Sequence, residues 1–146
     1  MTTSSSFDRV VPIRTSEDVL RARQASREVG IALGFDVEDQ TRIATAVSEI
    51  ARNVLQHSGA TGEVHLKDIV GGAMRGVAIV VTDAGCGIAS LESALGHDQS
   101  TFVLCRGAGL PGSKRLMDEF HVDTAVGKGT TVRMVKWLRR ALPSDS

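Results

Sequence analysis

The sequence predicts an α+β fold: a two-layer sandwich in which about three helices cover one face of a mixed, mostly antiparallel sheet of about five strands. Two observations lead to this class. Segments with helical periodicity stand between segments that are typical of hairpins. With 146 residues, 42% of them hydrophobic, the chain can bury one core without disulfides or metal. The predicted domain spans residues 9–140, between a disordered N-terminus, 1–8, and a flexible tail, 141–146.

The first predicted element is a strand over residues 9–14, which Pro12 restricts to an edge or an end of the sheet. A helix follows, with Thr15 or Ser16 as its N-cap and Gly34 at its end. The apolar stripe of this helix is narrow. We therefore expect one face to pack on the sheet and the arginine-bearing face to meet solvent or a partner.

The second predicted helix runs from Asp36 to about His57 and belongs to the core. Its apolar residues recur at three- and four-residue steps: Ile43, Val47, Ile50 and Val54. Glu49 and Asn53 are four residues apart, so they share one face of the helix, beside this apolar stripe. A carboxylate and a carboxamide in that position need polar partners or water.

The second half of the chain is predicted to hold two hairpins with a short helix between them, because apolar or alternating segments are joined by glycines on either side of one helical stretch. The tight turn of the first hairpin is Gly71-Gly72, and that of the second is 126–129. The elements are strands over 63–70 and about 74–82, a helix from Pro111 to about Phe120, and strands over 120–125 and 130–138.

Composition and charge exclude several classes of protein. The 17 lysines and arginines balance the 17 aspartates and glutamates, so no overall field attracts nucleic acid or an anionic membrane. The longest apolar run, 77–81, is too short to span a bilayer, and the first residues lack the features of a signal peptide. We therefore predict a cytoplasmic protein. Cys86 and Cys105 fit that compartment and form no metal-binding pair.

Two glycine clusters predict a nucleotide pocket that is closed by its own loop. Asp83, Gly85 and Gly87 stand at the end of an apolar strand, and residues 106–112 open a helix about twenty residues later. Glycines leave backbone N–H groups unshielded, and such groups at a helix start attract phosphate. The spacing is neither the Rossmann fingerprint nor a Walker A motif. The alternative is that Gly87 and Gly112 are ordinary turn and packing glycines.

Three polar residues suggest the chemistry of such a pocket. Asp83 can accept a hydrogen bond from an exocyclic amine of a base, or it can cap the turn that follows it. Asn53 offers an oxygen to Mg²⁺, which needs few protein ligands when it also binds phosphates and water. Glu49 is placed to take a proton from a hydroxyl or from water. The alternative for Glu49 and Asn53 is an ordinary hydrogen bond between helix side chains.

The start of the third helix supplies groups for phosphate binding. Gly107, Gly109 and Gly112 would present backbone amides, and Arg106 or Lys114 would add positive charge. The alternative for these two basic residues is a solvated position on the surface.

Four motifs in this order resemble the N, G1, G2 and G3 boxes of the GHKL ATPases, whose ATP site is the Bergerat fold of the histidine-kinase-like ATPases. They are Glu49-x-x-x-Asn53, Asp83-x-Gly85-x-Gly87, Gly107-x-Gly109 and Gly127-x-Gly129-Thr130. Segments 39–53, 107–120 and 136–138 are more closely similar to the RsbT-type switch kinases of bacterial stress signalling. The resemblance runs from about residue 9 to about residue 140.

The resemblance implies an ATP- and Mg²⁺-dependent protein serine/threonine kinase. Such a kinase phosphorylates a STAS-domain antagonist, is thereby released, and activates a PP2C-type phosphatase or another output protein, in some cases within a stressosome-like assembly. Glu49 would be the general base, Asn53 the Mg²⁺ ligand and Asp83 the adenine contact. The nucleotide-binding residues would be Asn53, Asp83, Gly85, Gly87, Arg106, Gly107, Ala108, Gly109, Leu110, Gly112 and Thr130.

One departure from the family pattern lies just before the third helix. Cys105 occupies a place where the family usually has another glycine, and Arg106 follows it. This departure concerns the loop that would close over the phosphates. Two alternatives to a kinase therefore stay open within the same fold: an anti-sigma factor that sequesters a sigma factor, and a nucleotide-gated adaptor with weak or no kinase activity.

Overall fold

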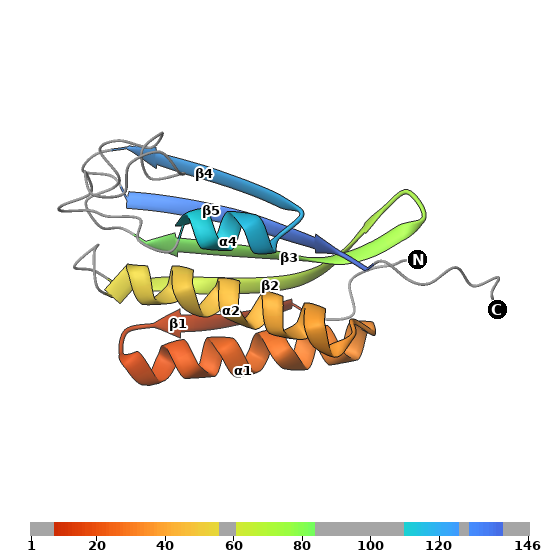
Figure 1. The fold of residues 1–146 in the computed structure, drawn as a ribbon. Coiled ribbons are helices and arrows are strands. Elements are labelled where there is room, and N and C mark those ends of the chain that lie inside the picture. The colour runs from red at the N-terminus through yellow and green to blue at the C-terminus, as the bar shows by residue number, and fades with distance from the viewer. Residues whose placement is uncertain (1–7, 56–60, 84–109, 126–128, 139–146) are drawn as a thin grey trace.

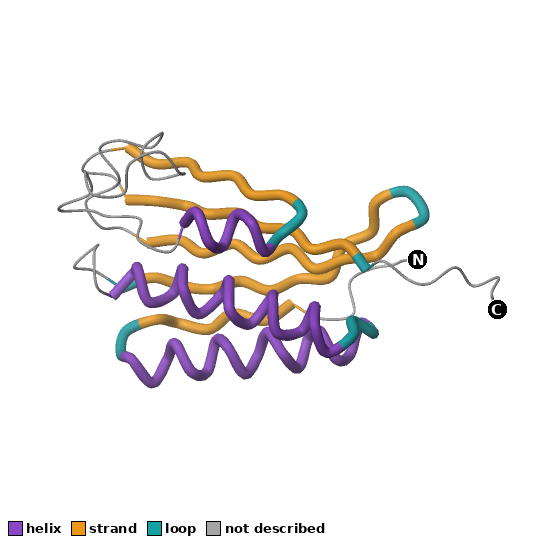
Figure 2. The backbone as a smooth tube through the Cα atoms, viewed as in Figure 1, coloured by secondary structure: helices purple, strands orange, loops and turns teal. Residues whose placement is uncertain are grey.

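The computed structural model describes residues 8–55, 61–83, 110–125 and 129–138 (Figure 1). Within these residues the chain forms a sheet and three helices, and Figure 2 shows all three helices on the same side of the strands. The elements are β1 (Asp8–Ile13), α1 (Ser16–Leu33), α2 (Val37–Asn53), β2 (Gly62–Gly71), β3 (Met74–Asp83), α4 (Leu110–Leu116), β4 (Glu119–Ala125) and β5 (Gly129–Trp137).

The sheet has five strands in the order β1-β2-β3-β5-β4, and each of its four strand pairings is antiparallel. Side chains alternate between its two faces, so the apolar residues of each strand meet the helices. The buried residues on this face of the three inner strands are Val64, Leu66, Val77, Ile79, Val81, Val132 and Met134. The predicted α+β class, with helices on one face of a largely antiparallel sheet, is confirmed.

Helix α2 lies between α1 and α4 (Figure 1). Its predicted stripe of Ile43, Val47, Ile50 and Val54 is buried. The carboxylate of Asp36 accepts a hydrogen bond from the amide of Asp39 at 2.8 Å, which caps the first turn. The α-helix ends at Asn53, a few residues before the predicted end near His57, and residues 56–60 lie outside the described part of the chain.

The prediction that the third helix continues to about Phe120 is wrong, because α4 ends at Leu116. Asp118 leaves the helix to bond with β5. Its amide donates to the carbonyl of Val135 at 2.9 Å, and its Oδ2 accepts the amide of Trp137 at 2.8 Å. Strand β4 then begins at Glu119 and pairs with β5. These partners are about twenty residues away in sequence, so local periodicity does not reveal them.

The predicted cap of α1 is confirmed, with Thr15 as the N-cap residue. One oxygen of Asp18 accepts the amides of Arg14 and Thr15, at 2.8 and 3.1 Å, and the other accepts the guanidinium of Arg21 at 2.7 Å. This carboxylate therefore fixes the turn between β1 and α1.

Replacing Asp18 by asparagine is expected to reduce the loss of folding stability that accompanies a fall in pH. The hydrogen bond from the Arg14 amide, with those from Thr15 and Arg21, lowers the pKa of Asp18 below its ordinary value of 3.8. A carboxylate with a lowered folded-state pKa stabilises the fold above that ordinary value, and this contribution is lost as the pH falls through the lowered pKa. Thermal unfolding measured as the pH falls below the ordinary pKa should show a smaller loss of stability for Asp18→Asn than for the wild type. Glu17→Gln, an exposed neighbour, should keep the wild-type profile.

No helix in the described residues is long and apolar enough to cross a membrane. Strand β1 begins at Asp8, one residue before the predicted start of the domain. The predicted end at residue 140 and both predicted tails lie in or beside parts of the chain outside the described residues. These boundaries stay predictions.

Candidate functional site

One end of the sheet gathers the termini of four elements. Strand β3 ends there and β5 begins there, and the C-terminal end of α2 and the start of α4 lie at the same end (Figure 1). The register pairs Asp83 with Thr130. Each lies two residues from a core residue of its strand, Val81 or Val132, so both half-buried side chains belong to the helix-facing side of the sheet.

Gly62 brings the end of α2 close to the end of β3. A Cβ atom at this position would overlap the carbonyl oxygen of Thr82 and would lie 3.0 Å from Cγ1 of Val54 and 3.2 Å from Cβ of Asp83. Val54 directly follows Asn53, so the close approach at Gly62 places Asn53 and Asp83 at the same end of the molecule. Sequence reasoning assigned no role to Gly62 and missed this contact.

The flank of α2 that faces α4 carries the predicted general base, Glu49, and the predicted Mg²⁺ ligand, Asn53. Asp39, Ala46 and Asn53 recur every seven residues, which is close to two helical turns, so they lie along one side of α2. Glu49 lies one turn before Asn53 on the same flank. The hydroxyl of Ser113, which is fully buried, donates to the carbonyl of Ala46 at 3.5 Å. Helix α4 therefore packs against this side of α2.

The direction of α4 follows from two contacts. Ser113, in the middle of α4, contacts Ala46. Leu116, at the end of α4, accepts a hydrogen bond from Lys136, and the same lysine pairs with Asp39 in the first turn of α2. The two helices thus run in opposite directions, and the start of α4 points toward the end of α2 that carries Asn53. Figure 1 shows the same arrangement.

Asn53 has a buried polar atom without a partner. Its Nδ2 is inaccessible to solvent and forms no hydrogen bond within the described part of the chain. Leaving such a group unsatisfied costs about 1–3 kcal/mol. The carboxamide can satisfy this requirement by donating to a ligand oxygen, or it can turn to direct Oδ1 at a cation. The described residues hold no group of three or more His, Cys, Asp or Glu side chains that could bind a metal. A single amide oxygen fits Mg²⁺ only when phosphates and water complete its ligands.

Glu49 is accessible to a second molecule. Its side chain is 42% exposed, and the guanidinium of Arg52 lies 3.4 Å from Oε2. An exposed pair at this distance contributes little to stability and can be displaced. Among the described residues, no hydrogen bond joins the side chains of Glu49 and Asn53. The alternative of a simple hydrogen bond between them therefore receives no support.

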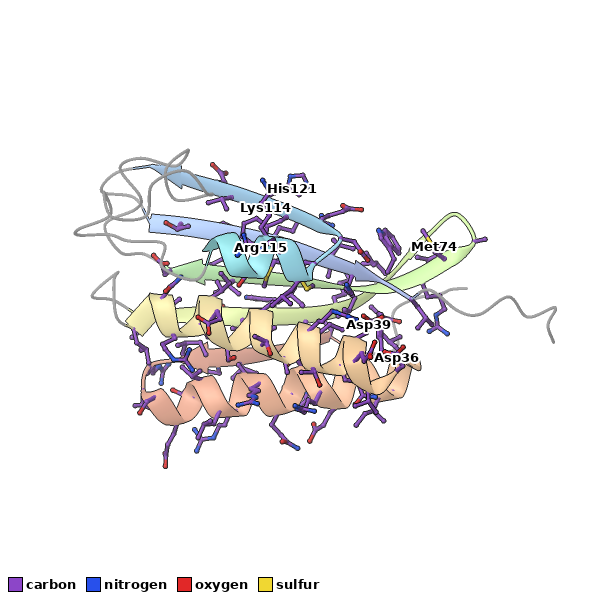
Figure 3. The ribbon with its side chains drawn as sticks, in the orientation of Figure 1. Asp36, Asp39, Met74, Lys114, Arg115 and His121 are labelled. Atoms are coloured by element: carbon purple, nitrogen blue, oxygen red, sulfur yellow. The ribbon has the colours of Figure 1, made fainter. Side chains whose placement is uncertain are left out.

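Gly112 lies in the first turn of α4, where a Cβ atom would meet nothing within 4 Å. Leu110 is the first residue of α4. Lys114 is exposed on the same helix, and Figure 3 shows it together with Arg115. The remaining predicted site residues, namely Gly85, Gly87, Arg106, Gly107, Ala108 and Gly109, lie outside the described residues, as do Cys86 and Cys105.

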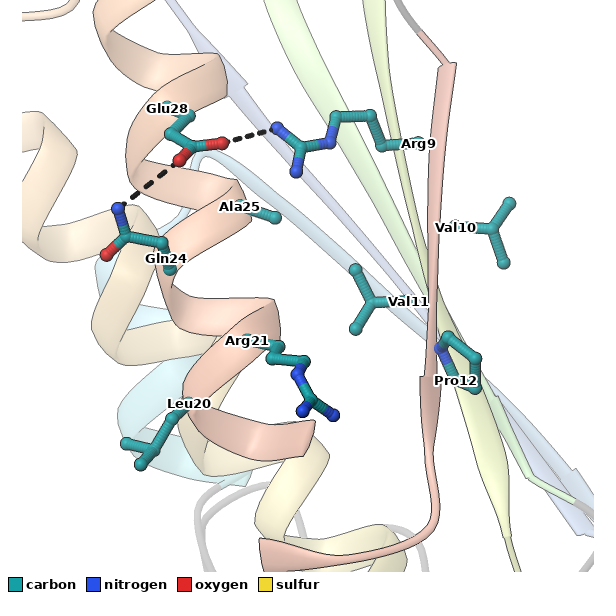
Figure 4. A pocket seen from close by; sticks show the side chains of 9 residues that line it. All are labelled: Arg9, Val10, Val11, Pro12, Leu20, Arg21, Gln24, Ala25 and Glu28. Carbon is teal, nitrogen blue, oxygen red and sulfur yellow. Dashed lines mark hydrogen bonds and ion pairs between the residues drawn. The ribbon is translucent and has the colours of Figure 1, made fainter. Parts of the chain in front are cut away.

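A separate groove lies between α1 and β1, which is an edge strand of the sheet (Figure 4). The guanidinium of Arg9 crosses it to the carboxylate of Glu28 at 2.7 Å, and this hydrogen bond lowers the pKa of Glu28. Its lining residues are Arg9, Val10, Val11, Pro12, Leu20, Arg21, Gln24, Ala25 and Glu28. Because α1 and α4 flank opposite sides of α2, this groove is not part of the candidate site.

Comparison with known proteins identifies the family. The histidine kinase-like ATPase domain matches residues 14–136. The chain is 41% identical over 129 residues to the serine/threonine-protein kinase RsbT of Bacillus subtilis, covering 88% of this chain and 96% of that protein. It is 33% identical over 109 residues to the anti-sigma F factor of Thermoanaerobacter sp., covering 70% and 73%. It is also 33% identical over 134 residues to that of Pasteuria penetrans, covering 85% of each.

These similarities support ATP use and protein serine/threonine kinase activity. The chain therefore belongs to the histidine kinase-like ATPase domain family, as a GHKL protein of the RsbT kinase type.

Proposed function

We propose that this protein is an ATP- and Mg²⁺-dependent serine/threonine kinase that phosphorylates a STAS-domain antagonist and thereby acts as a partner-switching regulator. The observation that carries the proposal is the unpartnered, buried amide nitrogen of Asn53. This amide shares a flank of α2 with the accessible carboxylate of Glu49, at the end of the sheet where Asp83 terminates β3.

In this proposal the two sides of the site bind different parts of ATP. Asp83 accepts a hydrogen bond from the exocyclic amine of adenine, and Gly85, Gly87 and Thr130 are further nucleotide-binding residues of the proposal. Asn53 holds Mg²⁺ through its side-chain oxygen. Once bound, Mg²⁺ neutralises charge on the phosphates and orients them. The phosphate-binding amides come from the segment that opens α4, comprising Arg106, Gly107, Ala108, Gly109, Leu110 and Gly112.

Glu49 acts as the general base toward the protein substrate. A serine hydroxyl of the partner gives its proton to the carboxylate of Glu49, and its oxygen attacks the γ-phosphorus of ATP. The bond between that phosphorus and the bridging oxygen breaks, ADP leaves, and the partner carries the phosphate. The exposure of Glu49 suits this role because the substrate hydroxyl must arrive from another protein.

The partners are those that the resemblance to RsbT-type kinases implies. The STAS-domain antagonist is the substrate, and a PP2C-type phosphatase or another output protein is activated after the kinase is released. A stressosome-like assembly is a further partner. We propose that all of these steps take place in the cytoplasm, without nucleic acid or membrane.

The decisive experiment is transfer of labelled γ-phosphate from Mg·ATP to the STAS-domain protein that co-purifies with this chain. We expect label on a serine or threonine of that partner. ATP binding without transfer would instead favour the nucleotide-gated adaptor. The absence of ATP binding to folded protein in calorimetry would contradict both the kinase and the adaptor.

An anti-sigma factor is the second candidate function, because the chain is 33% identical to two anti-sigma F factors over most of its length. Co-purification separates the two functions. A sigma factor bound to this chain would favour the anti-sigma role, whereas a STAS-domain protein alone would favour the kinase.

Replacing Gly112 by alanine is expected to weaken ATP binding by about tenfold without destabilising the fold. Apart from its chain neighbours and the backbone of its own helix, no atom of the described residues lies within 4 Å of the new methyl group. Alanine also favours a helix over glycine by about 0.5–1 kcal/mol. The same methyl group would obstruct a phosphate that approaches the backbone amide at this position. Calorimetry with Mg·ATP, together with urea unfolding, measures the two effects. Unchanged affinity in the stable variant would exclude Gly112 from the phosphate site.

A further inference from the structure

Lys136 is a buried lysine on the helix-facing side of β5, in line with the buried apolar residues Val132 and Met134. Only 9% of the residue is exposed. Its Nζ donates to the carbonyl oxygen of Leu116 at 2.9 Å and lies 3.8 Å from Oδ1 of Asp39 and 3.8 Å from Oδ1 of Asp118. A buried ammonium is costly unless it is paired and hydrogen-bonded. One side chain of β5 thus joins the end of α4, the first turn of α2 and the segment before β4. We call these four residues the Lys136 clamp.

Both carboxylates of the clamp are held by other bonds. Oδ1 of Asp39 accepts the guanidinium of Arg42 at 2.8 Å, and its amide donates to Asp36 at 2.8 Å. Oδ2 of Asp118 accepts the amide of Trp137 at 2.8 Å. Figure 3 shows Asp36 and Asp39 at the start of α2, the end opposite to Asn53. The clamp is therefore anchored on α2 through Asp39 and on the sheet through Asp118, and it holds the end of α4 between them.

Helix α4 is short enough for this anchor to matter at its other end. Its seven residues span about 10 Å, and its middle is attached to α2 through Ser113 and Ala46. A rotation about that middle contact, which the clamp at Leu116 opposes, would move the start of α4 relative to Asn53.

We propose that Lys136 is a positioning residue for nucleotide binding. By fixing the end of α4 against the first turn of α2, it sets the distance between Asn53 and the start of α4. Lys136 does not itself touch the nucleotide, since the clamp lies at the far end of both helices. This inference rests on the proposed function, because it assumes that these two features bind the same ATP.

A purely structural role makes a different prediction. Methionine has a similar volume and no charge, but removing one partner of a buried ion pair usually lowers stability. Asp39 and Asp118 would keep Arg42 and the Trp137 amide as partners, which limits this loss. Under a structural role, Lys136→Met would therefore be less stable than the wild type, but the folded variant would bind ATP normally. Under the positioning role, the folded variant binds ATP more weakly.

The test measures Mg·ATP affinity of the full chain by calorimetry, together with amide hydrogen exchange in α4. Lys136→Met should raise Kd by about tenfold, because small displacements of a binding group are costly, and should speed exchange in α4 but not in α1. Lys67→Met removes an exposed lysine from β2 and should change neither quantity. Asp39→Asn, which removes the charge on the α2 side of the clamp, should also raise Kd, but by a smaller factor than Lys136→Met.

The outcomes separate the two proposals. If the wild type binds Mg·ATP and folded Lys136→Met binds it with the same Kd, the positioning role alone is overturned. A wild-type chain that binds no ATP overturns the proposed function, and the positioning role with it. If Lys136→Met does not fold, Asp39→Asn decides, and an unchanged Kd in that variant overturns the positioning role.

Discussion

Glu49→Gln is expected to lower the rate of phosphoryl transfer to a protein serine by about 10²–10⁴-fold, which is the usual contribution of a general base. Glutamine has the same shape as glutamate but accepts no proton at neutral pH. The side chain is 42% exposed and its one ion pair within the described residues is the long pair with Arg52, so the substitution should leave the fold intact. ATP affinity should also stay close to that of the wild type, because the proposed nucleotide contacts come from other residues.

Single-turnover transfer from Mg·ATP to the STAS-domain substrate measures this effect, and calorimetry measures nucleotide affinity separately. Glu38→Gln is a matched control on the same helix, because its side chain is 80% exposed and lies near the other end of α2. A Glu49→Gln variant that transfers phosphate at the wild-type rate would exclude the general-base role. If Glu49→Ala left biological output unchanged, the nucleotide-gated adaptor would be favoured.

Helix α2 could be predicted from the sequence because local and long-range forces agree there. Its apolar residues recur with the helical period, and the same residues face the sheet. The positions of Glu49 and Asn53 beside that stripe follow directly. What the spacing does not reveal is which neighbour covers their flank. The packing of α4, through Ser113 on the carbonyl of Ala46, depends on residues 67 positions apart in sequence.

Glycines were harder to interpret because their role depends on distant side chains. The predicted turn Gly71-Gly72 is shifted by one residue in the structure: Gly71 is the last residue of β2, and the turn contains Gly72, with φ of 61°. A Cβ atom at Gly71 would lie 2.5 Å from the indole of Trp137, so this glycine makes room for a side chain on β5. Only the arrangement of the strands explains that requirement.

Lys136 also depends on tertiary structure. The only local signal is a lysine among the apolar residues at the end of β5, and an exposed position is the usual interpretation of a lysine. Its three partners come from α2, from the end of α4 and from the segment before β4. The glycine motifs, in contrast, assign Asp83 and Thr130 to one predicted pocket, and these two residues are cross-strand neighbours at the end that carries Asn53.

Asn53→Ala is expected to weaken Mg·ATP binding by about 10–100-fold while leaving the free protein at least as stable as the wild type. The loss of affinity corresponds to one charge-assisted contact of about 1.5–3 kcal/mol. Stability should not fall, because the substitution removes a buried Nδ2 that has no hydrogen-bond partner. Alanine also favours a helix more than asparagine does, so the free energy of unfolding could rise by up to about 1 kcal/mol.

Gln40 provides a matched control whose effects should have the opposite pattern. This residue is an amide on the same helix, and its Nε2 donates to the carbonyl of Phe35 at 2.8 Å. Gln40→Ala should therefore lower stability by about 1 kcal/mol, the net value of one hydrogen bond, and leave ATP affinity unchanged. Urea unfolding followed by the fluorescence of Trp137, the single tryptophan, measures the first quantity, and calorimetry measures the second.

Removing Mg²⁺ shows whether Asn53 acts through the metal. With a chelator present, ATP affinity of the wild type should fall toward that of Asn53→Ala, whereas the variant should lose little more, because the substitution has already removed the metal contact. If both proteins lost the same factor, Asn53 would contact ATP without the metal, through its Nδ2. An Asn53→Ala variant that bound Mg·ATP as tightly as the wild type would remove the residue from the site, and its unpartnered amide would then be only a local cost in the fold.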